Sequence, residues 1–324
     1  MKIYGIDLSK DKFDVSFISN ETEQKKIVSN NFKGICKFLQ QIDEGVLVAE
    51  YTGSYGDLLV HLCYLFKVKI ALVPGYNIKH SLGLQRGKSD SKDASRIRKY
   101  GERFYEDLYL TEPKHESIKE LKELYALREQ LAKSRKSLKL GHESRNHGPS
   151  QSIASHKGYE RAIGHLEKEI ELIEDEIKKI VQYNKDLKDN YKLITSIKGI
   201  GPVIANNLII KTENFKRINT AKKAAAFAGV CPYPNSSGKI SLNAKTSNIA
   251  DKKLKSLLFL AAKTAATHNK EYSLYAERKK LEGKPYYLIM NNISNKMLRT
   301  VYGVIKSRKP YDINHICHDP RLLN

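Results

Sequence analysis

The chain has 324 residues, 40% of them apolar, and its 57 Lys and Arg against 36 Asp and Glu give a net charge of +21. Its four cysteines form no C-x-x-C pair and follow no signal peptide, and the longest apolar run, near 257–262, is too short to span a membrane. These features argue against a secreted disulfide framework and a membrane protein, and they favour a cytoplasmic protein of about two domains.

The positive charge is concentrated toward the C-terminus. Residues 191–324 include 24 Lys and Arg and seven Asp and Glu, a net +17, whereas the first 190 residues carry the remaining +4. A folded segment this basic usually binds a polyanion, most often nucleic acid. The alternative is a solvated lysine-rich surface, which the uneven distribution disfavours.

The first hundred residues alternate between strand and helix patterns. The runs KIYGIDLS, FDVSFIS and QKKIVSN are rich in β-formers, and GICKFLQQI is helical. A buried strand at 45–50, a helix at 56–66 and a strand in VKIALVPG follow. Meandering strands followed by strand–helix–strand units predict a mixed sheet with helices on its faces, an α/β domain spanning 1–110.

The pattern becomes a helical heptad between 111 and 190. Apolar residues recur at alternating spacings of three and four, on both sides of the Gly-, Ser- and His-rich break GHESRNHGPSQSIASHKG. We expect a coiled-coil hairpin of two long helices, paired either internally or with another subunit. The stronger seam comprises Ile163, Leu166, Ile170, Ile173, Ile177 and Ile180.

A third, mainly α-helical domain is expected at 191–310, followed by a polar tail at 311–324. In its opening segment, IKGIGPVIA, Gly199 and Gly201 precede a helix. Small residues there leave backbone N–H groups free to bind a phosphate, although a plain helix entry explains the same glycines equally well. Three tyrosines near the end of the domain present a similar choice between base stacking and core packing, and core packing is favoured for each. They are Tyr286, Tyr287 and Tyr302.

Four carboxylates of the first domain lie where a metal site would be expected. Asp7 sits inside an apolar strand, where an unpaired acid is costly. Glu50 ends the strand GVLVAE, and sites in open sheets gather at strand ends. Asp90 and Asp93 share one face of a predicted helix start.

Convergence of these acids would cause strong repulsion unless a divalent cation neutralised it. Mg²⁺ prefers oxygen ligands, and it can activate a hydroxyl and stabilise the leaving oxygen in phosphodiester chemistry. Taken singly, Asp90 and Asp93 are more simply explained as helix-start acids, and Glu50 as an ordinary strand-end acid. Asp7 is the hardest of the four to explain without a metal.

The segment CPYPNSSGK offers a candidate nucleophile. Two prolines break the preceding helix and Gly238 permits a tight turn, so Ser236 and Ser237 are expected on an exposed loop beside Lys239. A serine hydroxyl is a weak nucleophile until a base or metal activates it. From chemistry alone the loop is a simple turn.

Three stretches of the first domain resemble a known family. YGIDLSKDKFDVSF, VAEYTGSYG and GKSDSKDA are similar to the blocks of a RuvC-like, ribonuclease-H-type domain. The closest resemblance is to the DEDD transposases of the insertion-sequence group called IS one-ten, the bridge-RNA-guided recombinases. In that family the DEDD acids bind the metal, so the resemblance implies that Asp7, Glu50, Asp90 and Asp93 hold Mg²⁺. Ser89 stands where the family usually has Thr.

The C-terminal domain resembles the same family. AAFAGVCPYPNSSGK matches a block whose serine, directly before Gly, attacks DNA and forms a covalent serine–DNA intermediate, and Ser237 holds that position. IKGIG matches a second block and favours a nucleic-acid role for its glycines. SNIADKKLKS resembles a third, with Asn248, Ala250 and Lys255 departing from the usual Lys, Gly and Arg. The expected nucleic-acid contacts are Lys88, Gly199, Gly201, Lys239, Lys245, Lys252, Lys253 and Lys255.

The sequence therefore predicts an insertion-sequence transposase that cuts and rejoins DNA by Mg²⁺-dependent attack of Ser237. The resemblance implies homodimers that meet as a tetramer on DNA element ends and target, guided by a structured RNA. It also implies a bacterial cytoplasmic protein that associates with the nucleoid when active. The alternatives are a site-specific DNA invertase of the same family, a RuvC-like nuclease or resolvase that uses only the acids, and a non-catalytic nucleic-acid-binding scaffold.

Overall fold

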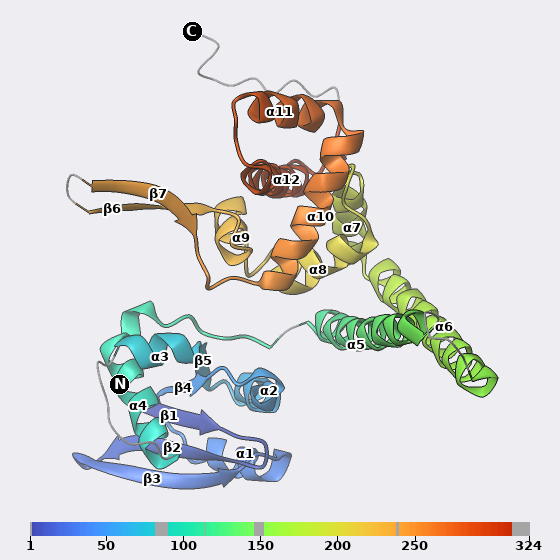
Figure 1. Cartoon of the computed structure of the whole chain (residues 1–324). Helices are drawn as coiled ribbons and strands as arrows, with labels where there is room; N and C mark the ends of the chain where they lie inside the picture. The colour runs from blue at the N-terminus through green and yellow to red at the C-terminus, as the bar shows by residue number, and fades with distance from the viewer. Residues whose placement is uncertain (1, 82–89, 114, 146–151, 238–239, 313–324) are drawn as a thin grey trace. The chain divides into compact units, whose positions relative to one another are not determined.

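The computed structural model describes residues 2–81, 90–113, 115–145, 152–237 and 240–312, and it describes their side chains except at 90–91, 234–237 and 240–245. The chain forms two compact units, Met1–Lys114 and His115–Asn324 (Figure 1). The first is α/β and the second is mainly helical, which confirms the fold class at this level. The predicted domain boundaries near residues 110, 190 and 310 stay predictions.

The first unit is built on a five-stranded mixed sheet with the order β3-β2-β1-β4-β5. β1 and β3 pair antiparallel with β2, whereas β4 pairs parallel with both β1 and β5. Parallel neighbours need crossover connections, which α1 and α2 supply. The predicted strands and mixed sheet are thereby confirmed. The strands are β1 (Ile3–Leu8), β2 (Lys12–Ser19), β3 (Thr22–Ser29), β4 (Val46–Glu50) and β5 (Lys69–Val73).

Helices cover both faces of this sheet. The even-numbered residues of β1 pack in one core cluster with α1 and α2, whereas Ile3 packs in another with α3 and α4. Because successive side chains of a strand point to opposite faces, Asp7 lies on the α4 face. The helices are α1 (Phe32–Leu39), α2 (Asp57–Leu65), α3 (Gly75–Ser81) and α4 (Asp90–Arg103), with 3-10 turns at Gly53–Gly56 and Tyr105–Asp107.

The second unit begins with the two predicted long helices, α5 (Glu116–Arg145) and α6 (Ile153–Tyr183). They pack against each other within the chain. Three isoleucines of the predicted seam on α6 are buried, and its other three apolar residues are half-buried. Arg128 on α5 donates two hydrogen bonds to Glu174 on α6, at 2.9 and 2.7 Å. Of the two pairings left open by the sequence, the structure shows the internal one.

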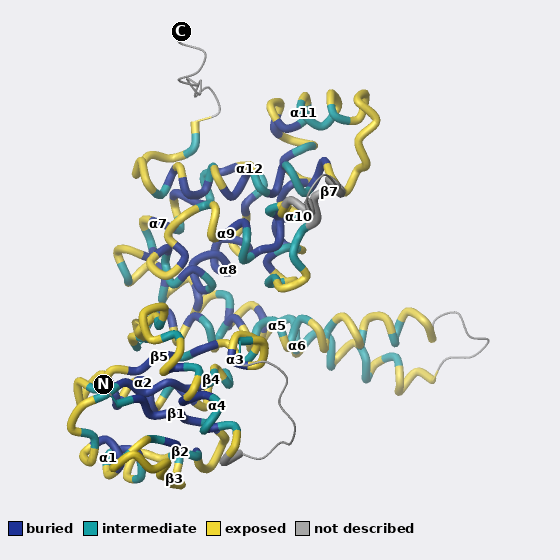
Figure 2. Tube along the Cα trace, turned by 90° about the vertical axis from the view of Figure 1, so that its left-hand side faces the viewer, coloured by how far each residue is buried: buried dark blue, intermediate teal, exposed yellow. Residues whose placement is uncertain are grey.

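Six further helices share one core with α5 and α6. Figure 2 shows α8 largely dark blue, whereas the far ends of α5 and α6 are teal and yellow. No helix in the described part of the chain is long and apolar enough to cross a membrane. The helices are α7 (Lys185–Thr195), α8 (Pro202–Thr212), α9 (Ala221–Phe227), α10 (Lys252–His268), α11 (Lys270–Leu281) and α12 (Tyr286–Ser307).

The three tyrosines of α12 divide between the two roles considered for them. Tyr302 is buried and its hydroxyl donates to the Ile218 carbonyl, so its core role is confirmed. Tyr286 and Tyr287 are 50% and 75% exposed. The core packing favoured for these two is wrong, because both rings lie against partly buried Phe259 at the surface of the core.

The serine segment is a β-hairpin, so the expected loop is wrong, whereas the expected exposure of its serines stays a prediction. β6 (Pro232–Ser237) pairs antiparallel with β7 (Ile240–Thr246). Pro232 begins its strand, and the pairing is irregular between Tyr233 and Asn235, which leaves Pro234 at the irregularity. Proline is tolerated at these two kinds of strand position because its missing N–H is not needed there. The prolines therefore end the helical segment without preventing a strand.

Candidate functional site

Asp7 is the half-buried exception in an otherwise buried β1. Its register partner on β2 is Asp14, so two acids lie directly opposite each other on neighbouring antiparallel strands. Like charges in this arrangement are destabilising unless something compensates them. Asp14 is an acid of this edge that the sequence analysis did not select.

Glu50 ends β4, beside Asp7. The parallel register pairs Ile6 with Ala49, so the next position on each strand brings Asp7 and Glu50 side by side. The Glu50 carboxylate lies directly over Gly75, the first residue of α3. A Cβ on Gly75 would overlap Glu50 Oε1 and lie 2.8 Å from its Cδ. Gly75 therefore leaves the space that this carboxylate occupies.

α4 crosses the sheet antiparallel to β1. A Cβ on Gly5 would lie 2.7 Å from Arg98 Cα, and a Cβ on Gly101, later in α4, would lie 2.9 Å from Cγ2 of Ile3. Later residues of α4 thus lie over earlier residues of β1. The first turn of α4 consequently approaches the end of β1 that carries Asp7.

Asp90 and Asp93 belong to that first turn. Asp90 begins α4, and its side chain lies outside the described residues. The half-buried Asp93 forms an ion pair with Arg96 at 2.7 Å. The backbone therefore brings Asp7, Glu50 and the start of α4 to the same edge of the sheet.

The chemistry of this edge suits a hard divalent cation. Its candidate ligands are all carboxylates, and Mg²⁺ prefers oxygen ligands. Glu50 is accommodated by a glycine, and Asp7 and Asp14 lie opposite each other on neighbouring strands. Among the side chains that the structure describes, however, no three His, Cys, Asp or Glu groups could hold a metal ion. The described acids Asp7, Glu50 and Asp93 thus do not form a metal-binding group by themselves, and the side chain of Asp90 lies outside the described residues.

Ser237 lies in the other unit, as the last residue of β6, opposite Ile240. Ser236 precedes it and pairs with Ser241. Both serine side chains lie outside the description, as does that of Lys245 on β7. The hairpin joins Ser237 to Ile240 through two residues only, so the serine stands at the connecting end of the hairpin.

The predicted nucleic-acid contacts have different surroundings. Lys252 is exposed, Lys253 forms an ion pair with Glu129 at 2.7 Å, and half-buried Lys255 donates to Thr246 at 3.3 Å. All three lie in α10. Because Lys253 and Lys255 are engaged in these contacts, Lys252 is the most accessible of the three to a phosphate. Lys88 and Lys239 lie outside the described residues.

The two glycines before α8 differ from each other. Gly199 has φ +96°, and a Cβ there would lie 2.9 Å from the Ala261 carbonyl oxygen, so packing against α10 requires a glycine. Gly201 is the exposed N-cap of α8, with open space where a Cβ would be. Packing thus explains why residue 199 is a glycine. Gly201 is the better candidate for a phosphate contact.

Comparison with known families accounts for both units. A transposase model of the DEDD, IS110 type matches residues 4–142, a range that includes all four candidate acids. A second family model, described as "Transposase IS116/IS110/IS902 family", matches residues 191–277, which include the serine hairpin. The chain belongs to the IS110 family of transposases. As a member of this family it is a DNA recombinase.

Two relatives match this IS110-family chain over nearly its whole length, and a third matches part of it. It is 28% identical to the pilin gene-inverting proteins of Moraxella bovis and Moraxella lacunata, over 95% of this chain and 97% of each relative. It is also 24% identical to the insertion element IS900 uncharacterized 42 kDa protein of Mycobacterium paratuberculosis, over 37% of this chain and 30% of that protein. The similarity to the pilin gene-inverting proteins therefore spans both units of the chain.

A buried arginine that sequence analysis missed holds α4 on the sheet. Arg98 is 6% exposed, donates to Ser16 Oγ at 3.2 Å and to Glu23 Oε1 at 3.3 Å, and pairs with Glu102. Burial by itself raises the pKa of Glu23, but hydrogen bonds from Ser16, Ser95 and Arg98, with the Arg98 charge, lower it to about 2. Helical spacing could have found Arg98. It lies four residues after Ala94 and three before Gly101, and small residues at this spacing indicate the helix face that packs on the sheet.

Proposed function

We propose that this chain cuts and rejoins DNA by attack of the Ser237 hydroxyl on a phosphodiester, with Mg²⁺ held by Asp7, Glu50, Asp90 and Asp93. The observation that supports this most strongly is the meeting of Asp7, Glu50 and the first turn of α4 at one sheet edge. Bound Mg²⁺ would favour ionisation of the attacking hydroxyl and stabilise the leaving oxygen.

The proposed reaction is a pair of transesterifications. Ser237 Oγ loses its proton to a base and bonds to phosphorus, while the bond from phosphorus to a deoxyribose oxygen breaks and that oxygen takes up a proton. The DNA end is then esterified to Ser237. Attack by a deoxyribose hydroxyl of the second strand forms the new DNA linkage and returns the proton to Ser237. No phosphodiester is lost, so strand exchange needs no energy source.

The acids and the serine lie in different units of the chain. The reaction therefore requires them to meet, and we assign that meeting to a homo-oligomer in which the units of different subunits pair. A dimer that forms a tetramer on two DNA sites suits strand exchange, because each cut end needs its own serine. The net +17 of residues 191–324 would bind both DNA and a structured guide RNA.

Inversion of a DNA segment is the outcome that similarity favours. The two relatives matched over nearly their whole length are named pilin gene-inverting proteins, whereas the insertion-element match covers 37% of this chain. Inversion and transposition use the same bond changes and differ in how the two sites are arranged. A plasmid carrying two opposed candidate sites would separate them: inversion changes the orientation of the segment, and transposition moves it to a second plasmid.

The test of the chemistry is a protein–DNA adduct that survives denaturation. The full-length chain is incubated with Mg²⁺, RNA transcribed from the DNA flanking its gene, and a labelled DNA junction. Wild type and Ser236→Ala should form the adduct, whereas Ser237→Ala and Asp7→Ala should not. Metal-dependent cutting by both wild type and Ser237→Ala, without an adduct, would instead establish a nuclease that uses the acids alone.

A further inference from the structure

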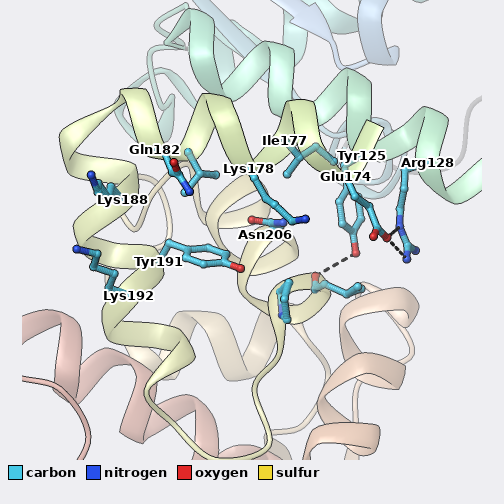
Figure 3. Close-up of a pocket in the computed structure, with 13 residues that line it drawn as sticks. Tyr125, Arg128, Glu174, Ile177, Lys178, Gln182, Lys188, Tyr191, Lys192 and Asn206 are labelled. Atoms are coloured by element: carbon cyan, nitrogen blue, oxygen red, sulfur yellow. Dashed lines mark hydrogen bonds and ion pairs between the residues drawn. The ribbon is translucent and has the colours of Figure 1, made fainter. Parts of the chain in front are cut away.

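A cavity of about 620 Å³ opens between α5, α6, α7 and α8 in the second unit (Figure 3). None of the residues that line it takes part in the function proposed above. This volume is in the range of small-ligand sites, large enough for one nucleotide and too small for a duplex. The residues that line the cavity therefore indicate which small ligand it could bind.

One side of the cavity offers a flat aromatic surface among apolar groups. The half-buried Tyr191 extends from α7 into the cavity, toward Asn206, as Figure 3 shows. Ile177 and Val181 from α6 line the cavity as well. The other tyrosine, Tyr125, is committed, because its hydroxyl donates to a backbone carbonyl at 3.1 Å. Tyr191 is thus the ring against which a planar ligand could stack.

Asn206 on α8 also lines the cavity and is 8% exposed. Its Oδ1, however, is completely buried and has no hydrogen-bond partner within the described part of the chain. This oxygen therefore lies behind the cavity surface, and a ligand in the cavity is held by Tyr191 and by the charged rim.

The rim of the cavity is positively charged. Lys188 and Lys192 lie one turn apart on α7, and neither has an acidic partner among residues 2–81, 90–113, 115–145, 152–237 and 240–312. The other lining cations, Arg128 and Lys178, form ion pairs at 2.7 and 2.8 Å. Two uncompensated ammonium groups beside a stacking surface suit an anionic planar ligand, of which a nucleotide is the commonest.

We propose that this cavity binds one unstacked nucleotide of a single-stranded nucleic acid. Its base stacks on Tyr191, and its flanking phosphates bind Lys188 and Lys192. The site is separate from the acids and from Ser237, so it anchors a strand and does not cut it. Single-stranded RNA and DNA share this chemistry.

The test measures binding without catalysis. The full-length Ser237→Ala chain, without Mg²⁺, is titrated into fluorescent ribo- and deoxyribo-octanucleotides that carry a central 2-aminopurine. We expect Tyr191→Leu to weaken binding about tenfold and to abolish the change in 2-aminopurine emission. Lys188→Gln with Lys192→Gln should lower the slope of log K against log salt by about 1.4. A ribo- or deoxyribo-preference would identify the strand as RNA or DNA.

Matched controls lie just outside the cavity, at the junction of α6 and α7. Tyr183 ends α6 with 89% of its surface exposed, and Lys185 begins α7, and neither lines the cavity. Tyr183→Leu and Lys185→Gln should bind within twofold of the parent. Equal effects of the cavity and control variants would overturn the proposal. The paired Lys188→Gln and Lys192→Gln substitutions lie at half-buried and exposed positions, so they keep the test decisive if Tyr191→Leu fails to fold. Because catalysis is absent throughout, failure here leaves the serine chemistry untouched.

Discussion

Gly75→Ala separates a catalytic role of Glu50 from a structural one. The added Cβ would overlap Glu50 Oε1 and lie 2.8 Å from Cδ, whereas carbon–carbon contacts normally lie at roughly 3.5–4.0 Å. The carboxylate must consequently move by about 1 Å. Because it ends a flexible side chain, the move costs only about 1 kcal/mol in rotamer strain. A misplacement of about 1 Å in a catalytic group, however, lowers the rate on the order of 10²-fold.

The assay compares the rate of adduct formation with the thermal unfolding of the same protein. Gly75→Ala should lose about two orders of magnitude in rate and need more Mg²⁺, with an almost unchanged unfolding temperature. Gly164→Ala on α6 is the control, since a Cβ there meets nothing within 4 Å. It should keep the rate and gain about 0.5–1 kcal/mol from helix propensity. A wild-type rate and Mg²⁺ requirement in Gly75→Ala would refute the placement of Glu50 at the metal.

Three further predictions concern stability. Arg98→Met should lower the free energy of unfolding by about 2 kcal/mol, less than the loss of a fully buried pair because Glu23 is partly exposed. Hydrogen exchange of peptides from β2 and α4 measures this loss, and unchanged exchange in the variant would contradict the prediction. The lowered pKa of Glu23 means that its contribution is complete above the ordinary value of 4.5 and is lost as the pH falls toward about 2. Glu23→Gln should flatten the fall in stability between these pH values, and an identical pH profile in the variant would show that other groups cause the fall. Gly199→Ala, at φ +96° and against the Ala261 carbonyl, should cost about 1–3 kcal/mol in urea unfolding, whereas Gly303→Ala, with open space around it, should not.

Local patterns in the sequence predicted the elements of the first unit because each strand and helix there has a clear period. They also singled out Asp7, since an acid between two buried apolar residues is conspicuous in any strand. The β6–β7 hairpin was missed, although ISLNAKT alternates apolar and polar residues from Ile240 to Ala244. Its prolines were read as helix breakers only, and their tolerance at a strand start and an irregularity depends on a partner strand.

The sequence by itself determined the period of each element, the uneven charge and the identity of the conspicuous acids, because these properties depend on neighbours along the chain. Only the tertiary structure decided which distant residues meet. It laid α4 antiparallel across β1, placed Glu50 over Gly75 and buried Arg98 against Ser16, 82 residues away. It also assembled one cavity from Tyr125, Tyr191 and Asn206. Such contacts depend on how closely backbones pack, which local periodicity does not encode.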